Sequence, residues 1–240
     1  MSRVLTIARR ELFAYLRSPL GSAIIAAVLL IDGIWFYWFG MSQKLVSADV
    51  LREFIYPASG MTTIAALFLS MRLLAEERQS GTLTLLNTAP IRDRDIVLGK
   101  YLSVLTVLVI MTLCTAYMPA LIFVRGKVSV GHILVGYLGI LLIGSAAAAI
   151  GIFASSLARS QIVALVVGAV VLGVMILLWA LAKAVDPPLN TFLSALAFHH
   201  ENFRPFMIGT LMLDRVVYYV AVTFFFLLAA IKVLEARRWR

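Results

Sequence analysis

Six long apolar runs dominate this sequence and restrict what it can fold into. They cover residues 20–39, 55–75, 96–124, 133–157, 162–182 and 216–234. Each reaches the roughly 20 residues that an α-helix needs to cross the ~30 Å hydrocarbon core of a bilayer. The runs are continuous rather than alternating, so they differ from barrel strands, and only helices then satisfy the backbone in lipid. We therefore predict an all-α integral membrane protein with six transmembrane helices.

The composition favours lipid over water as the solvent. Hydrophobic residues make up 62% of the chain and charged residues 14%, and the mean hydropathy is +0.98. Soluble domains hold roughly 45–50% apolar and about 25% charged residues. The single cysteine, Cys114, lies inside an apolar run, which excludes an intrachain disulfide and a cysteine-based metal site.

The net charge of +9 fits the positive-inside rule better than it fits nucleic-acid binding. Most of the 21 Lys and Arg residues fall in one of the two alternating sets of segments that flank the runs, and that set includes both termini. Both termini are therefore predicted to be cytoplasmic, which requires an even number of spans. Residues 1–18 are too charged for a cleavable signal peptide.

Residues 1–19, before the first run, have the pattern of an amphipathic helix. The charged residues Arg9, Arg10, Glu11 and Arg17 lie outside an apolar arc of about 120°, and Ile7 and Phe13 also depart from that arc. The arc holds Val4, Leu5, Ala8, Leu12, Tyr15 and Leu16. Ser18-Pro19 ends the helix. A basic helix with one apolar face lies in the membrane interface, either as a simple anchor or as a lever that contacts a cytoplasmic partner.

Residues 76–92 are the most informative polar segment. Glu76 and Glu77 end the second run, Gly81 permits a sharp turn, and Pro90 stops a short helix just before Arg92. The short helix begins at Thr82 and presents Leu83, Leu85 and Leu86. A short helix with exposed leucines, held between two spans, is typical of a docking element. An ordinary interfacial loop is the alternative.

One carboxylate lies inside a predicted span. Asp32 falls near the middle of the first run, where a charge is costly unless it is paired or hydrated. We expect it either on a substrate path or in a polar contact with another helix. Lys183 and Arg215 are the candidate partners for that contact.

Small residues follow one face of the fourth run. Gly144, Ala148, Gly151 and Ser155 recur at helical spacing, and such a stripe lets two helices approach closely. Packing within the chain is favoured over a subunit interface.

The stretch 186–213 is too polar for a clean span and too apolar for a free loop. It opens with Asp186-Pro187-Pro188, which stops a helix. We predict a pair of short or re-entrant helices on the outer side, before the sixth span. His199 and His200 lie here without a third ligand, so they are expected to be solvated loop residues, and no metal site is predicted.

Two of these segments together resemble the permease subunits of ABC-2-type transporters. They are Arg9-Arg10-Glu11-Leu12…Leu16-Arg17-Ser18-Pro19 and Glu76-Glu77-Arg78…Gly81-Thr82-Leu83…Pro90-Ile91…Gly99-Lys100. The small six-span form is similar to gliding-motility-type and nitrous-oxide-maturation-type permeases. The order of elements in that family covers nearly the whole chain, so residues 1–240 are predicted to form a single domain. The resemblance implies that residues 76–92 are a coupling segment that inserts into an ATPase.

The resemblance also implies partners. These are two ABC ATPase subunits, a second permease subunit that is the same or related, the bilayer of a bacterial inner membrane, and an accessory extracytoplasmic protein as a further candidate, with no nucleic acid. By the same resemblance, the first and fifth spans line the dimer interface and the substrate path, and transport is export.

The chain holds no P-loop of its own. Neither Gly99-Lys100 nor Gly126-Lys127 has the upstream glycine or the following Ser/Thr that the motif requires. No cofactor is therefore expected in this chain, no catalytic residue is assigned, and ATP and Mg are expected in the partner ATPase. A non-transporting membrane scaffold that anchors an ATPase or assembly complex is the alternative function.

Overall fold

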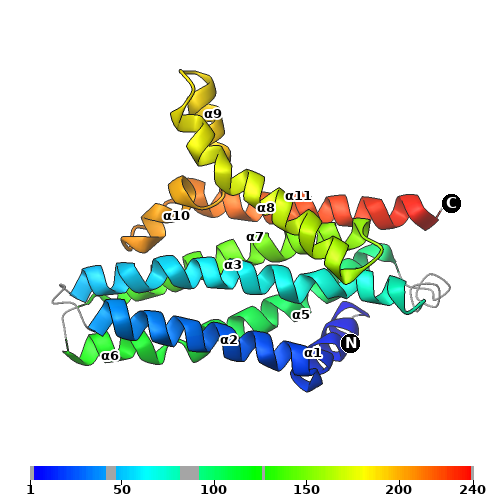
Figure 1. Ribbon diagram of the computed structural model, residues 1–240, viewed down its shortest axis with the longest axis horizontal. Coiled ribbons are helices and arrows are strands. Elements are labelled where there is room, and N and C mark those ends of the chain that lie inside the picture. Colours follow the sequence, from blue (N-terminus) through cyan, green and yellow to red (C-terminus); the bar gives the residue numbers. More distant parts are fainter. Residues whose placement is uncertain (1–2, 42–46, 82–91, 126–127, 239–240) are drawn as a thin grey trace.

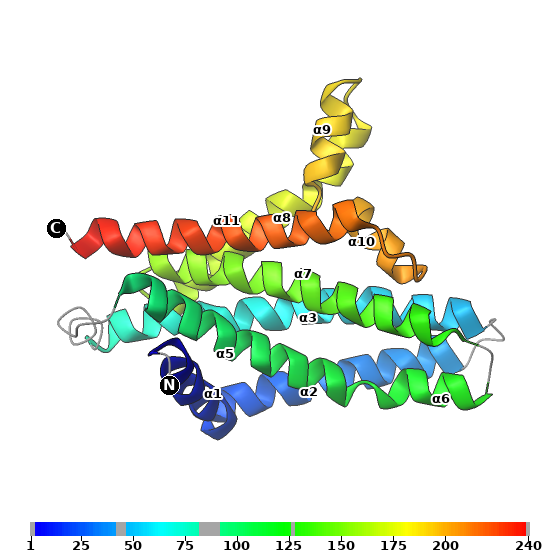
Figure 2. The same cartoon turned by 180° about the vertical axis from the view of Figure 1, so that it is seen from behind.

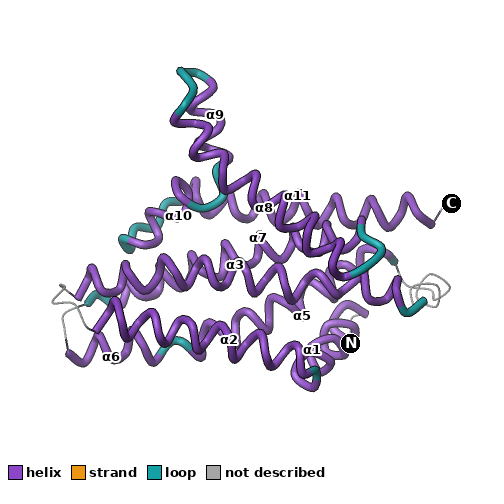
Figure 3. Tube along the Cα trace, in the orientation of Figure 1, coloured by secondary structure: helices purple, strands orange, loops and turns teal. Residues whose placement is uncertain are grey.

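Long helices that run side by side define the architecture (Figure 1). The computed structural model describes residues 3–41, 47–81, 92–125 and 128–238, and every regular element within these ranges is helical (Figure 3). Six helical stretches are long and apolar enough to cross a membrane: Pro19–Trp38, Asp49–Gln79, Asp93–Ile122, Val130–Leu157, Gln161–Lys183 and Leu213–Arg237. The predicted all-α fold with six membrane-spanning helices is confirmed.

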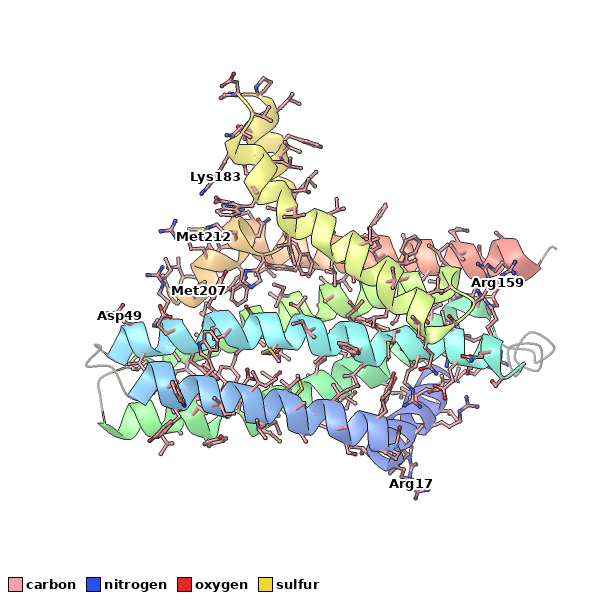
Figure 4. The ribbon with its side chains drawn as sticks, viewed as in Figure 1. Arg17, Asp49, Arg159, Lys183, Met207 and Met212 are labelled. Carbon is pink, nitrogen blue, oxygen red and sulfur yellow. The ribbon has the colours of Figure 1, made fainter. Side chains whose placement is uncertain are left out.

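The elements follow one another with short connections. They are α1 (Arg3–Arg17), α2 (Pro19–Trp35), the π-helical turn η1 (Phe36–Met41), α3 (Ser47–Gln79), α5 (Asp93–Cys114), α6 (Tyr117–Arg125), α7 (Val130–Leu157), α8 (Gln161–Lys183), α9 (Leu189–Leu196), α10 (His200–Met207) and α11 (Leu213–Arg238). Both ends of the chain lie at the same end of the bundle, on the right of Figure 1. We call this the terminal end, and the opposite end, where Asp49 lies in Figure 4, the distal end.

The centre of the bundle is the contact between α3 and α7. The most apolar part of α3 is 72% buried, whereas the corresponding parts of α8 and α11 are 17% buried. A side chain on Gly144 would put its Cβ 2.8 Å from Thr62 Cγ2, and one on Gly151 would collide with the Ser70 hydroxyl. Ala148 is fully buried in the same contact layer. The stripe of small residues on α7 thus allows the close approach of α3 within the chain.

Ser155, the last residue of that stripe, inserts its hydroxyl into the backbone ladder of α3. Its Oγ donates to the carbonyl of Met71 at 2.7 Å and accepts from the N–H groups of Leu74 and Ala75 at 3.1 and 3.0 Å. One side chain of α7 therefore satisfies three backbone groups of α3.

The third span is broken near its middle. α5 ends at Cys114 and α6 begins at Tyr117, and between them the N–H of Thr115 donates to Thr112 at 3.2 Å. Pro119 lies in the first turn of α6. Its ring clashes with the carbonyl four residues earlier, which belongs to Thr115. The break in the third span therefore falls just before Pro119.

The fifth span, α8, departs from the bundle. It crosses the other helices obliquely and, with α9, projects away from them in both Figure 1 and Figure 2. Its outward face is apolar and exposed: Val166, Val170 and Leu177 are 56%, 59% and 60% exposed. The two short helices predicted within 186–213 are α9 and α10.

Candidate functional site

At the terminal end, α1 crosses the bundle and packs on α5 and the beginning of α2 (Figure 2). The contact with α5 is at backbone distance: a Cβ on Gly99 would lie 2.8 Å from Ile7 Cβ and 3.0 Å from the Val4 carbonyl oxygen. Tyr15 is 1% exposed, and its hydroxyl donates to the carbonyl of Leu69 in α3 at 2.5 Å. The amphipathic helix is therefore docked on the spans rather than separate from them.

The buried side of α1 differs from the predicted apolar arc. Leu5 and Leu16, expected inside the arc, are 53% and 49% exposed. Ile7 and Glu11, expected outside it, face the bundle instead. The reason is local: Gly99 leaves room for Ile7, and Lys100 on α5 supplies a cation that compensates the burial of Glu11.

Four charged side chains meet beneath α1 and form what we call the ionic cluster: Arg10, Glu11, Glu77 and Lys100. Lys100 is at its centre, with a side chain 2% exposed. Its Nζ donates to Glu77 Oε1 at 2.8 Å and to Glu11 Oε1 at 3.1 Å. Arg10 Nη2 lies 3.1 Å from Glu11 Oε1 and 3.4 Å from Glu77 Oε1. The cluster joins α1, the end of α3 and the start of α5, and its two positive and two negative charges balance.

The charges in the cluster stabilise one another against burial. Burial by itself raises the pKa of the Glu11 carboxyl, but the attraction of Lys100 and the hydrogen bonds from Lys100 and Arg10 outweigh it and leave the pKa lowered. Glu11 is therefore ionised at neutral pH. Removal of one partner from such a group leaves a buried charge without compensation, which costs more than an exposed pair gains.

Two further arginines fix the same end of α3. Arg72 forms an ion pair with Glu76 at 3.0 Å, donates to Ser18 Oγ at 3.1 Å, and lies 5.1 Å from the centre of the Tyr15 ring. Arg78 donates to the carbonyls of Ser156, at 2.9 Å, and Ala158, at the end of α7. α3 is thereby bonded to the α1–α2 turn through Arg72 and to α7 through Arg78.

The polar segment expected at 76–92 begins at this cluster. Glu76 and Glu77 are in the last turn of α3, Gly81 has the positive φ of +74° that favours glycine, and exposed Arg92 precedes α5. Thr82, Leu83, Leu85, Leu86 and Pro90 lie outside the described residues. The ionic cluster thus joins the two helices between which the predicted docking leucines are found in the sequence.

A comparison with known protein families identifies the chain. The family model described as ABC-2 family transporter protein matches residues 5–234. The chain belongs to the ABC-2 transporter family. It is therefore the multi-pass membrane domain of a permease and does not itself hydrolyse ATP. No curated protein matches it.

Lys100 was not predicted from the sequence to be a site residue. The signal was available, because Lys100 is the one lysine within the third apolar run and a buried ammonium requires acidic partners. By contrast, Arg9 and Arg17 lie on the exposed side of α1, 5.7 and 6.0 Å from the centre of the Phe13 ring. They take no part in the ionic cluster.

Neither proposed partner of Asp32 reaches it in the permease. Lys183 lies 4.1 Å from the centre of the Trp179 ring, and Arg215 pairs with Asp214 and Asn202. The expectation of a pair with either residue is wrong, because α8 carries Lys183 away from α2 onto the projecting arm (Figure 4). Asp32 itself is 3% exposed.

Of the two histidines within 186–213, His199 is packed rather than solvated, whereas His200 is exposed. His199 Nε2 lies 2.8 Å from Ser59 Oγ, and the ring packs on Tyr56 and Phe203. Burial, assisted by His200, lowers the pKa of His199 to about 4, so it is neutral at pH 7. His200 lies 4.2 Å from the ring of Trp179. Within the described ranges no group of three or more His, Cys, Asp or Glu could hold a metal ion.

Proposed function

We propose that this permease is the membrane subunit of an ABC exporter, and that separate ATPase subunits move its spans through residues 76–92. One observation carries the proposal: the ionic cluster joins α1 to both helices that flank residues 82–91. A segment that docks a partner transmits force only when the helices on either side of it are fixed. Lys100 of α5 fixes them through its ion pairs with Glu77 of α3 and Glu11 of α1.

The contacts at the terminal end provide a route for the motion. Lys100 links any displacement of the ends of α3 and α5 to α1, and α1 continues through Ser18 into α2. Arg78 links the same end of α3 to α7. Because packed interfaces are not continuously deformable, a shift at this end is passed to four spans together.

The proposed assembly contains two permease subunits, identical or related, and two ATPase subunits that hold ATP and Mg²⁺. Both termini and residues 76–92 face the cytoplasm in this arrangement, in the inner membrane of a bacterium. The exposed apolar faces of α2 and α8 supply surface for the second permease subunit. An accessory protein on the outer side would contact the distal end, where α10 lies.

The proposal is tested by replacing both Leu83 and Leu85 with Asp. If these side chains are anchors at about 2 kcal/mol each, ATPase binding weakens by roughly 30-fold for each leucine that is replaced. The matched control replaces Thr84 and Asn87 with Asp, which adds the same charge and keeps the leucines. Co-purification of the ATPase and the ATPase rate in liposomes are the two measurements.

The outcome separates the alternatives. Loss of the ATPase with the leucine variant alone supports docking through this segment. Recovery of the native complex without any ATPase subunit would contradict the proposed function. A defined substrate that stimulates ATP hydrolysis favours transport over a scaffold role.

A further inference from the structure

Asp32 points into the bundle of its own chain. It is 3% exposed, whereas its neighbours on α2, Leu30 and Ile34, are 60% and 54% exposed. The outward side of α2 is therefore apolar, and the carboxyl is on the opposite side of the helix. This orientation places Asp32 away from lipid and away from any subunit that covers the outer face of α2.

The carboxyl has no hydrogen-bond or ion-pair partner among the residues that the structure describes. Its Oδ1 is completely buried without a donor. Tyr137 of α7 interacts with Asp32 electrostatically, and its hydroxyl contacts Thr115 at the break between α5 and α6.

The neighbouring hydroxyl groups of Thr115 and Tyr137 already use their protons in other hydrogen bonds. Thr115 Oγ1 donates to the carbonyl of Thr112 at 2.8 Å, and it lies 3.1 Å from Tyr137 Oη. Each hydroxyl has a single proton. Since the proton of Thr115 is used, Tyr137 is the donor in its contact with Thr115 and has none left for Asp32.

Among the described side chains, the helices around Asp32 offer it no cation. α3 has no titratable side chain between Tyr56 and Arg72, and α5 has none between Tyr101 and Cys114. The titratable groups of the described residues that interact electrostatically in this region are the phenols of Tyr117 on α6 and Tyr137 on α7. α2 itself contains no Lys, Arg or His.

We propose that Asp32 is a proton-binding site within the membrane, and that its carboxyl carries a proton while α2, α3 and α6 are packed as in this structure. An ionised carboxylate here would be buried without a hydrogen-bond donor or a cation from the described residues, and protonation removes the charge. Separation of α2 from α3 and α6 admits water and releases the proton, so the occupancy of the proton site reports the packing of the bundle. The inference does not depend on which partner drives the motion.

Infrared spectroscopy of the full chain in lipid tests this directly. At neutral pH the wild type is expected to show the C=O band of a protonated carboxylic acid, shifted in D2O. Asp32→Asn removes that band, and Asp186→Asn, a change at an exposed residue after α8, retains it. Isotopic labelling of aspartate carboxyls shifts the band in the wild type itself, so the measurement does not rely on a variant that folds.

Two results would overturn the proposal. One is an isotope-sensitive signal that consists only of carboxylate bands at neutral pH. The other is an acid band that disappears when Na⁺ replaces a large organic cation at constant pH, because an alkali cation would then be the ligand of Asp32.

Discussion

The ionic cluster and Asp32 bury carboxyl groups of one bundle under opposite conditions. In the cluster, Lys100 lies within 3.1 Å of both Glu11 and Glu77. At Asp32 no cation and no hydrogen-bond donor from the described residues reaches the side chain. Burial therefore leads to different chemistry at the two places: the first group keeps its charges because they neutralise one another, and the second is stable only without a charge. The proposed transmission of force relies on the first arrangement, and the proposed response to hydration relies on the second.

The largest effect is expected when the cluster loses its central cation. Lys100→Met leaves two buried carboxylates facing each other, so we expect the free energy of unfolding to fall by about 3–5 kcal/mol. Thermal or denaturant unfolding of the purified chain in lipid discs measures the change. Lys232→Met is the matched control, since Lys232 is 75% exposed and pairs only with Glu235. Similar losses for the two variants would show that the cluster is not a stabilising centre.

Acid should weaken the same cluster through Glu11. Because the pKa of Glu11 is lower in the folded chain than its ordinary value of 4.5, its contribution is fully present above that pH and is lost as the pH falls through the folded value. The loss is smaller than for Lys100→Met, because one carboxyl changes rather than the central cation. Unfolding followed against pH in the wild type and in Glu11→Gln measures the effect. Parallel acid profiles for the two proteins would rule out this role of Glu11.

The smallest effect is expected at the unpaired carboxyl. Asp32→Asn keeps the shape of a protonated aspartic acid without its titration, so the free energy of unfolding at neutral pH should change by less than about 1 kcal/mol. The same unfolding measurement applies. A loss as large as that of Lys100→Met would mean that Asp32 is charged and paired, and the contrast between the two regions would disappear.

Hydropathy was sufficient to predict the spans, because each of the six runs must satisfy its backbone in lipid. The close packing of α7 was equally predictable, because Gly144 and Gly151 allow a neighbouring helix to approach closely. The orientation of α1 was not. A helical wheel assigns Glu11 to the solvent, and only the position of Lys100 under the helix reverses that assignment.

The partners of Asp32 could not be predicted for a different reason. Sequence gives the depth of Lys183 and Arg215 in the membrane but not the lateral course of their helices. α8 leaves the bundle and holds Lys183 over Trp179 on the projecting arm. Pro119 illustrates the same limit on a smaller scale, because the break in the third span lies between Cys114 and Tyr117 rather than at the proline itself.

The hydroxyl of Ser155 has a mechanical consequence for α3. It bonds to the carbonyl of Met71 and to the N–H groups of Leu74 and Ala75, and so enters the backbone ladder of a helix of 33 residues at one level. A side chain inserted into the ladder is a recognised place for a helix to bend. The stretch that bears Glu76, Glu77 and Arg78 begins immediately beyond it. If α3 bends near its terminal end, we therefore expect the bend at this level, between the long part of the helix and the short segment that bears the ionic cluster.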